Sequence, residues 1–537
     1  MSKRNYNIFF NTHTVSGIVV SVALYIIFFA GAFALFKEEI DLWEEGGTVS
    51  KTEHQNIDFD NILEQLDRKH ELIGRDIQLN FGAENDKISV FMSTSKDSLT
   101  LEKGTESHYY LVDIHSGDTQ TYPEYYGLGE FLYRLHFFAQ IPTVGIYLAG
   151  IVSLLFLFAI VTGLIVHWKK IIPNFYKFNP KASIKRIWTD SHTALGVLGV
   201  PFQLIFAITG AYFGLSVLVL LPGKILYDGD QNKMMEDLRP TRKSYEWQAR
   251  ADDEVPSFNY YVRNTAQKYE NFHLTRGYIK NYGGRNMKIV VNGELATSER
   301  YVGAGSITYD AYTGVVESEK DPNKLSYIED VQFVLGRLHF ADFGGLTMKI
   351  IYFILALITC FVIITGVLIY VEARNKKSKT LKQRLYTAKV GHIYLAICLS
   401  MLPVTAVSFL FVKIAHGYFV DKQTTIYWFY FITWFVAIVY FRLKRDNYHT
   451  NKMNLLLGAV FGFLVPIVNG IVSGNWLWKT FSEEQFDVLL IDLLWIGIAI
   501  TSLLFYLNIK PQIKEKSTFA KRPIDYKNLN KSSGIAI

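Results

Sequence analysis

Long apolar runs, separated by charged segments, dominate the sequence of 537 residues. A transmembrane helix needs about 20 mostly apolar residues, and eight runs are long enough to be such helices. The expected fold is therefore a polytopic all-α membrane protein with about eight transmembrane helices. The first run is too long for the core of a signal peptide and lacks a small-residue cleavage site, so we expect it to remain as a helix. The runs cover residues 15–36, 143–168, 193–221, 347–371, 393–414, 425–442, 453–473 and 487–508.

Lysine and arginine gather in alternate connections between these runs. Cytoplasmic loops of membrane proteins carry an excess of these residues, so we expect both termini and the basic loops to be cytoplasmic. The segments 37–142 and 222–346 then lie outside, in the periplasm if the cell has two membranes. The basic residues are Lys169, Lys170, Lys177, Lys181, Lys185, Arg186, Arg374, Lys376, Lys377, Lys379, Lys382, Arg384, Lys389, Arg442, Lys444, Arg445 and Lys452.

Each long external segment predicts a small α+β domain. In the first segment, an amphipathic stretch at 59–72 predicts a helix, and a strand pattern runs into a glycine turn at 109–117. In the second segment, the corresponding stretches are 260–269 and 309–314. The predicted organisation is a first span in 1–36, an external domain and interfacial segment in 37–142, two spans with a basic loop in 143–221, a second external domain in 222–346, a fourth span in 347–371, a basic loop in 372–392, four spans in 393–508 and a basic tail in 509–537.

A motif of four residues occurs twice in the chain. Residues 134–137 and 337–340 both read Arg-Leu-His-Phe, and a Thr-Gly pair follows each at the same distance, at 162–163 and 365–366. All of these positions share an offset of 203 residues. A repeat that keeps a second landmark in register indicates an internal duplication.

The first and third apolar runs repeat each other in the same way. His13 is followed by glycine after four and after eighteen residues, and His192 is followed by glycine at the same two spacings. The predicted core is therefore a duplicated two-helix unit, with an external domain inserted in each copy. The last four runs show no such duplication.

Composition narrows the chemistry that this membrane protein can perform. Only 19% of the residues are charged and the net charge is +6, so no nucleic-acid partner is expected. The two cysteines, Cys360 and Cys398, both lie inside apolar runs. This placement predicts buried apolar side chains and excludes a cysteine-based zinc site, an iron–sulfur site and a disulfide framework.

Two pairs of histidines occupy matching positions in the duplicated unit. His136 and His339 precede helices that run inward, so both are expected at the outer side of the membrane. His13 and His192 precede helices that run outward, so both are expected at the cytoplasmic side. Two imidazoles facing each other suit a six-coordinate haem iron. We therefore expect two b-type haems, an outer and an inner one; simple anchoring of amphipathic histidines at the interface is the alternative.

The inner pair stays open to alternatives on the sequence alone. His167 ends an inward helix at the depth of the inner pair, but its duplicate is Tyr370, and His392 is a third choice. His136 and His167 are too distant to share one iron, because a straight helix between them is about 46 Å long. Arg134 and Arg337 suit haem propionates, since a guanidinium pairs with a carboxylate, and anchoring at the interface explains them equally well.

The chain resembles the PepSY-associated transmembrane proteins, often described as iron-regulated membrane proteins. The external segments are similar to PepSY domains, which end in aspartate–turn–glycine strands. The residues that carry the resemblance are His13-x-x-x-Gly17, Thr162–His167, Trp188–Phe202, Leu338–Ala341, Asp113–Gly117 and Asp310–Gly314.

A characterised branch of this family consists of di-haem reductases of ferric siderophores in the bacterial inner membrane. The resemblance implies an enzyme that passes electrons from the cytoplasmic side through two haem b groups to an external ferric siderophore or other ferric chelate. Fe(II) is then released for uptake. Some relatives carry a fused flavin and nicotinamide reductase domain that this sequence does not contain, so we expect a separate cytoplasmic or quinol donor.

Some further residues have two interpretations. Aromatic residues beside the outer pair are candidates for the docking surface of the chelate, with an aromatic belt at the membrane interface as the alternative. Asp492, near the outer end of the last run, is expected to have a structural or interfacial role. The aromatic candidates are Tyr122, Tyr125, Tyr126, Tyr133 and Phe137.

Two other classes of function compete with a reductase. An iron or siderophore permease, or an uptake accessory without redox activity, would bind a metal or a proton at the histidines. It predicts charged residues near mid-bilayer, and the first four runs contain almost none. A regulatory module that binds a peptide through its external domains leaves the eight helices and the paired histidines unexplained.

Overall fold

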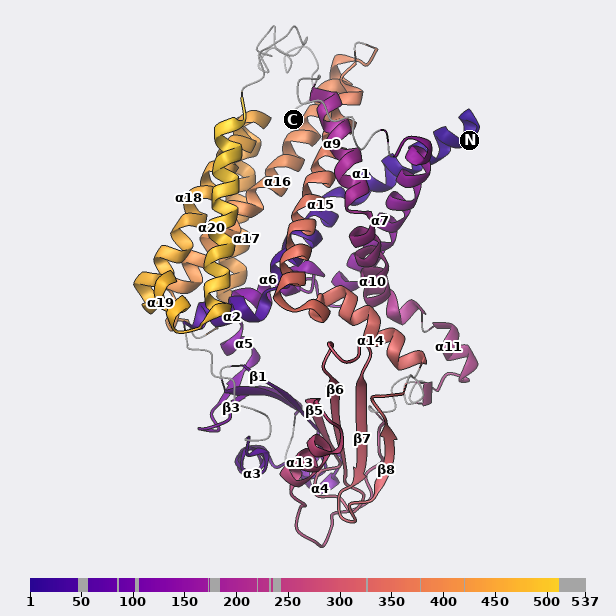
Figure 1. Cartoon of the computed structure of the whole chain (residues 1–537), viewed down its shortest axis with the longest axis vertical. Helices are drawn as coiled ribbons and strands as arrows, with labels where there is room; N and C mark the ends of the chain where they lie inside the picture. The colour runs from indigo at the N-terminus through magenta and orange to yellow at the C-terminus, as the bar shows by residue number, and fades with distance from the viewer. Residues whose placement is uncertain are drawn as a thin grey trace.

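The structure is a computed structural model of the chain. A helical region forms one end of the molecule and a β-sheet with its packed helices forms the other (Figure 1). Lys177, Lys181, Lys377 and the tail beyond residue 510 lie outside the described residues. The described residues are 1–46, 57–84, 86–101, 106–171, 173, 184–219, 221–230, 233–234, 243–324, 327–376, 378–419 and 421–510.

Seven helices in these described ranges are long and apolar enough to cross a membrane, and a bent pair adds an eighth span. The prediction of a polytopic helical membrane protein is therefore confirmed at this level. The seven helices are α1 (Lys3–Ala34), α7 (Gly145–His167), α15 (Gly345–Arg374), α16 (Leu381–Ile414), α17 (Lys422–Lys444), α18 (Asn447–Ser473) and α20 (Phe486–Asn508).

The third apolar run folds as two helices rather than one. α9 (Ile184–Leu198) and α10 (Val200–Val219) meet at an angle of 70°. Gly199 lies between them and Pro201 follows. Proline lacks a backbone N–H and its ring clashes with the preceding helical turn, so it bends or ends a helix. The bend gives the two halves of this span different directions against their neighbours.

The spans form two groups. In the first group, α1 packs against α7 and α15, α10 packs against α7, and α9 packs against α15. Each contact in this group has a counterpart, because α1 with α7 corresponds to α9 with α15, and α1 with α15 corresponds to α10 with α7. In the second group, α16 packs against α17 and α18, and α18 packs against α20. The short helix α19 (Leu477–Ser482) precedes α20.

Short helices lie at the boundary between the spans and the sheet (Figure 1). Two of them, α6 and α14, each carry a copy of the repeated Arg-Leu-His-Phe motif near their last residue. Their positions place both motif histidines at the same end of the helical region. The helices are α2 (Lys37–Glu45), α5 (Tyr122–Tyr125), α6 (Leu128–His136), α11 (Leu221–Leu226) and α14 (Tyr327–Phe340).

Within the described residues, the segments 37–142 and 222–346 each contribute four strands to a single eight-stranded sheet, in the order β4-β3-β2-β1-β5-β6-β7-β8. The sequence predicts a separate module in each segment, but β1 and β5 pair antiparallel, with Ile77 opposite Ile279. This pairing covers two edges whose backbone groups would otherwise stay unpaired. The strands are β1 (Ile77–Glu84), β2 (Lys87–Met92), β3 (His108–Asp113), β4 (Thr119–Thr121), β5 (Phe272–Lys280), β6 (Lys288–Leu295), β7 (Ala304–Asp310) and β8 (Val316–Lys320).

Helices from both segments close the apolar side of this sheet. α3 (Phe59–His70) and α13 (Phe258–Lys268) pack together, with the short helix α4 (Ser98–Leu101) nearby. The Phe59 ring lies 4.8 Å from the Phe81 ring and 5.7 Å from the Phe258 ring, between centroids. The two segments therefore share one apolar core as well as one sheet.

The N-terminus and the end of α20 lie at the end of the helical region away from the sheet (Figure 1). The start of α9 and the connection from α15 to α16 lie at that same end. The basic connections and the sheet are therefore at opposite ends of the spans.

Candidate functional site

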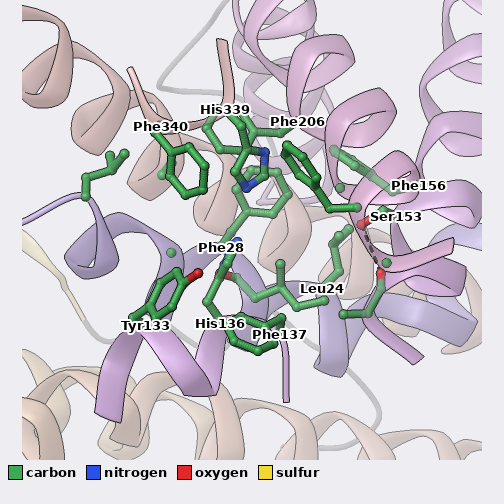
Figure 2. A pocket seen from close by; sticks show the side chains of 18 of the residues that line it. Leu24, Phe28, Tyr133, His136, Phe137, Ser153, Phe156, Phe206, His339 and Phe340 are labelled. Atoms are coloured by element: carbon green, nitrogen blue, oxygen red, sulfur yellow. Dashed lines mark hydrogen bonds between the residues drawn. The ribbon is translucent and has the colours of Figure 1, made fainter. Parts of the chain in front are cut away.

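The two histidines of the repeated motif face each other at the sheet end of the first helix group. His136 ends α6 and His339 is the penultimate residue of α14. The centroids of their rings are 5.9 Å apart and the ring planes differ by 48°. Both rings point into one cavity (Figure 2). The structure thus brings together two residues that lie 203 positions apart in the sequence.

His136 is held against α1. Its Nδ1 atom lies 2.8 Å from the carbonyl oxygen of Ile27. A carbonyl oxygen only accepts, so Nδ1 carries the hydrogen and donates it. Gly31, one turn further along α1, gives the ring room, because a Cβ atom at that position would lie 2.5 Å from Nδ1 of His136. The second glycine of the repeated spacing therefore has a steric role in the first copy.

His339 is held differently. Its Nδ1 atom lies 2.8 Å from the hydroxyl oxygen of Thr209 on α10. The Thr209 hydroxyl donates its own hydrogen to the carbonyl oxygen of Ile205, at 2.6 Å, so it accepts from Nδ1–H of His339. Alanine, Ala30, occupies the corresponding position of α1. Thr209 was not identified from the sequence, and its only signal there is a hydroxyl next to the repeated glycine Gly210.

A cavity of about 310 Å³ surrounds these two rings. Its walls are mostly apolar and aromatic, and glycines of α1 and α10 contribute to them (Figure 2). The Phe206 and Phe213 rings lie 5.1 and 5.2 Å from the His339 ring, between centroids. An apolar cavity with two converging imidazoles is typical of a cofactor site rather than of a solvated interface.

The second histidine pair lies at the other end of the same helix group. The rings of His13 on α1 and His192 on α9 are 6.1 Å apart between centroids, with planes at 67°. Nδ1 of His13 lies 2.8 Å from the carbonyl oxygen of Ala159, and Nδ1 of His192 lies 2.9 Å from that of Val362. The two acceptors are separated by the same 203 residues as the repeated motif, so this pair is held symmetrically.

The Thr-Gly repeat explains how these rings fit. A Cβ atom at Gly163 would lie 3.0 Å from Cε1 of His13, and one at Gly366 would lie 3.1 Å from Cε1 of His192. Gly163 therefore leaves space for the His13 ring, and Gly366 leaves space for the His192 ring. The preceding threonines donate their hydroxyls to the carbonyls that hold the histidines, Thr162 to Ala159 at 3.2 Å and Thr365 to Val362 at 2.9 Å.

All four rings present the same nitrogen for a further ligand. Because Nδ1 donates a hydrogen bond in each, Nε2 keeps its lone pair. Histidines that bind metals have this arrangement, with the other ring nitrogen bonded to a carbonyl or similar acceptor. Two collinear bonds of about 2 Å from imidazole nitrogens to one metal ion place the ring centroids about 6.3 Å apart. The observed separations of 5.9 and 6.1 Å are close to this spacing.

The two pairs are stacked along α1. His13 belongs to the inner pair, and Ile27 holds the outer pair from fourteen residues further along the helix. At 1.5 Å per residue the two sites are about 21 Å apart. That separation fits within the hydrocarbon core of about 30 Å.

The other candidate inner ligands have different surroundings. His167 ends α7 one turn after Gly163, and Gly163 is the residue that leaves room for the His13 ring. His392 belongs to the second helix group, where its Nδ1 lies 2.5 Å from Oδ1 of Asn447. The geometry therefore pairs His13 with His192, keeps His167 beside them and separates His392 from them.

The two motif arginines bind carboxylates of the protein. Arg134 donates to Glu130 at 2.7 Å and lies over the Tyr122 ring. Arg337 is buried and donates to Glu294 of β6 at 3.0 Å, which ties α14 to the sheet. A propionate contact at either arginine remains a prediction, and it requires the guanidinium to share or exchange its present partner.

The aromatic candidates divide into two sets. Tyr133 and Phe137 line the cavity (Figure 2). Tyr122 donates to Glu130 at 2.6 Å, and Tyr126 donates to Tyr427 at 3.3 Å. Tyr125 packs against Tyr122, with centroids 5.5 Å apart. The second set therefore forms a cluster outside the cavity, between α5 and α17.

Asp492 is fully buried between α20, α18 and α2. It accepts hydrogen bonds from Trp43 at 2.8 Å and from Asn469 at 2.9 Å. These bonds fit the structural part of the predicted role, and the burial leaves no contact with interfacial water. Lys413 of α16 is also fully buried and donates to the Trp43 carbonyl. Lys413 was not predicted from the sequence, although a lysine inside an apolar run is itself a signal of a functional or structural role.

The sequence of the chain was compared with those of known proteins and protein families. No curated protein matches the sequence of the chain. The model of the PepSY-associated TM region matches residues 10–373, which include both histidine pairs and the whole sheet. Because the match covers more than half of the chain, the protein belongs to the family of the PepSY-associated TM region.

Proposed function

We propose that the protein is a transmembrane electron-transfer enzyme that uses two b-type haems to reduce a ferric siderophore or another ferric chelate on the external side. One observation carries this proposal: two histidine pairs lie in one helix group, with rings 5.9 and 6.1 Å apart. In both pairs each Nδ1 is engaged in a hydrogen bond. Such pairs would hold a haem iron through their free Nε2 atoms.

His136 and His339 would hold the outer haem, and His13 and His192 the inner one, with His167 as the rival inner ligand. A haem iron with two histidine ligands supplies reversible one-electron transfer. The backbone carbonyls and the Thr209 hydroxyl fix the orientation of the rings, and hydrogen bonds of this kind make imidazole a stronger ligand.

Aromatic side chains pack beside the outer pair. The Phe206 ring is 5.1 Å from His339 and 4.5 Å from the Phe202 ring, which in turn is 6.3 Å from Phe28, all between centroids. Phe206 and Phe28 line the outer cavity, and Phe202 and Phe28 are buried. These rings would exclude water from the outer haem.

The proposed orientation places both termini in the cytoplasm and the sheet in the periplasm of a bacterial inner membrane. Two features support it: the basic connections, and the position of the sheet at the end opposite the N-terminus and the end of α20 (Figure 1). A cytoplasmic or quinol donor would then supply electrons at the inner pair, and the chelate would receive them at the outer pair.

The reaction at the outer side would be the transfer of one electron to Fe(III) in the chelate. Fe(II) binds oxygen donors more weakly and leaves the chelate for uptake. Tyr133 and Phe137, which line the outer cavity, and the tyrosine cluster beside it would form the docking surface. Iron and siderophore specificity rest on the family resemblance, whereas the two haem sites rest on the histidine geometry.

An absorption spectrum tests this proposal. Protein purified after expression with adequate haem should show a reduced-minus-oxidised b-haem spectrum and about two haems per chain. His136→Ala or His339→Ala should remove one haem and leave the other reducible. His449→Ala is the matched control, because His449 lies near the start of α18, away from both pairs, and should keep two haems. Colourless wild-type protein would exclude the reductase and favour the permease class.

A further inference from the structure

The short helix α2 lies at the centre of the external end of the molecule. It follows α1 directly and packs against α6, α16 and α20. Trp43 is fully buried and Glu44 is 1% exposed. A tryptophan and a carboxylate in such a short helix are buried only when surrounding elements supply partners for them. The origin of those partners indicates what α2 does.

One set of partners comes from the second helix group. The Trp43 indole donates to Asp492 of α20 at 2.8 Å, and Asp492 is fixed by Asn469 of α18 at 2.9 Å. Lys413 of α16 donates to the Trp43 carbonyl. Lys422 of α17 forms an ion pair with Glu44 at 2.9 Å. Three spans of the second group therefore hold α2 directly, and α18 supports it through Asp492.

The other set of partners is the beginning of α6. The backbone N–H of Leu128 donates to Glu44 at 2.8 Å, and that of Gly129 donates to Asp41 at 2.8 Å. The first N–H groups of a helix have no partner within it, and Gly127 at the N-cap has no side chain to supply one. Two carboxyl groups of α2 therefore cap α6 from outside, because their oxygens accept from its first backbone N–H groups.

The contact between α2 and α6 is too close to allow other side chains at the beginning of α6. A Cβ atom at Gly127 would lie 2.2 Å from Oδ1 of Asp41. At Gly129 a Cβ would lie 2.3 Å from the Lys37 carbonyl oxygen and 2.7 Å from Oδ1 of Asp41. The two glycines thus fix the distance between the helices.

His136 is at the other end of this capped helix. α6 has nine residues, so Gly129 and His136 are only about 10 Å apart along its axis. A rigid helix of two and a half turns transmits a displacement of its capped end to its last residue. The His136 ring has little freedom of its own, because Gly31 contacts it on one side and the Ile27 carbonyl holds its Nδ1.

We propose that Asp41 and Glu44 are positioning residues for His136, and that the second helix group acts on the outer histidine pair by holding α2 in place. This gives the four spans without a duplicate a function in the site of the first group. The inference about the haem rests on the proposed function, whereas the capping of α6 by α2 does not.

The first test needs no haem. Hydrogen–deuterium exchange is measured on peptides that cover residues 127–132 in the full-length protein. Asp41→Ala should speed exchange of the capped amides by about fivefold to tenfold, the usual cost of a lost cap. Asp41→Asn keeps an acceptor oxygen and should restore protection. Asp446→Ala is the control, since Asp446 caps α18 through Tyr448 and His449 and should leave these peptides unchanged. Unchanged exchange in Asp41→Ala would overturn the capping role.

The second test measures the outer haem itself. Asp41→Ala should shift the midpoint potential or the electron paramagnetic resonance signal of one haem and leave the other haem unchanged. Asp41→Asn should return the shifted haem to its wild-type potential and signal. Gly129→Ala provides an independent variant, because it pushes α6 from α2 while both carboxylates remain. Faster exchange without any change in either haem would overturn the positioning role. Wild-type protein without haem would exclude the proposed function but leave the exchange result valid.

Discussion

The inner and the outer histidine pairs are built in different ways from the same repeated unit. The inner pair is symmetric, since both rings sit on spanning helices and donate to backbone carbonyls at equivalent positions. The outer pair is asymmetric, with a carbonyl partner for His136 and a hydroxyl partner for His339. Its rings belong to short helices that lie between the spans and the sheet. The inner pair therefore depends on the spans alone, and the outer pair also depends on its surroundings.

This difference separates a symmetric site from one that is tied to neighbouring parts of the molecule. α14, which carries His339, is tied to the sheet through Arg337 and Glu294. α6, which carries His136, is tied to the second helix group through α2. If both pairs hold haems, the outer site can respond to changes in the sheet or in the second group.

The largest effect is expected from filling the space that a glycine leaves for a ring. Gly31→Leu should abolish the outer haem, because even a Cβ atom would lie 2.5 Å from His136. Gly163→Leu should abolish the inner haem for the same reason at His13. Each variant should bind about half of the wild-type haem, as measured by a pyridine haemochrome assay, since rings that cannot approach each other cannot share one iron.

Gly497→Leu is the matched control, in a spanning helix of the second group, α20. No atom of the described structure lies within 4 Å of a Cβ at Gly497, so this variant should retain both haems. If Gly31→Leu and Gly163→Leu removed the same haem, the division into an outer and an inner site would be wrong.

The sequence identified the spans and the four histidines because both leave a regular signal. Apolar length predicts a span wherever it occurs, and the constant offset of 203 residues between the copies predicts that His136 faces His339. Thr209 gave no such signal, since Ala30 takes its place in the other copy. The pairing of Trp43 with Asp492, 449 residues away, could not be predicted, because a contact at that separation depends on how the two helix groups dock. The joining of β1 with β5 depends on tertiary contacts in the same way.

A smaller effect is expected from the hydroxyl that holds His339. Thr209→Val keeps the shape of the side chain but removes the acceptor for Nδ1–H. Loss of such a partner costs about tenfold to a hundredfold in metal affinity, and we expect the outer haem to dissociate correspondingly faster in a haem-transfer assay. The equivalent change at the inner pair, Thr365→Val, should have little effect, because the Val362 carbonyl remains as the acceptor for His192 at 2.9 Å. Equal effects of the two variants would contradict the asymmetry between the pairs.

The smallest effect is expected from the titration of Asp41. This residue acts on the outer pair, and the inner pair has no corresponding residue. Burial raises the pKa of the Asp41 carboxyl to about 7, with Glu44 and Glu130 acting in the same direction and Lys37 opposing them. A carboxyl whose pKa is raised on folding contributes stability that is complete below its ordinary pKa of about 3.9 and is lost as the pH rises through 7.

Hydrogen exchange of the α6 region, measured between pH 5 and pH 8, reports how readily this region unfolds. In the wild-type protein it should unfold more readily as the pH rises. In Asp41→Asn, which carries no titrating group but keeps the acceptor oxygen, this dependence should be weaker, while the exchange of amides around His13 should show no difference between the two proteins. Identical pH profiles in the α6 region would mean that Asp41 does not ionise in this range, and the outer pair would then lack the pH sensitivity that distinguishes it here from the inner pair.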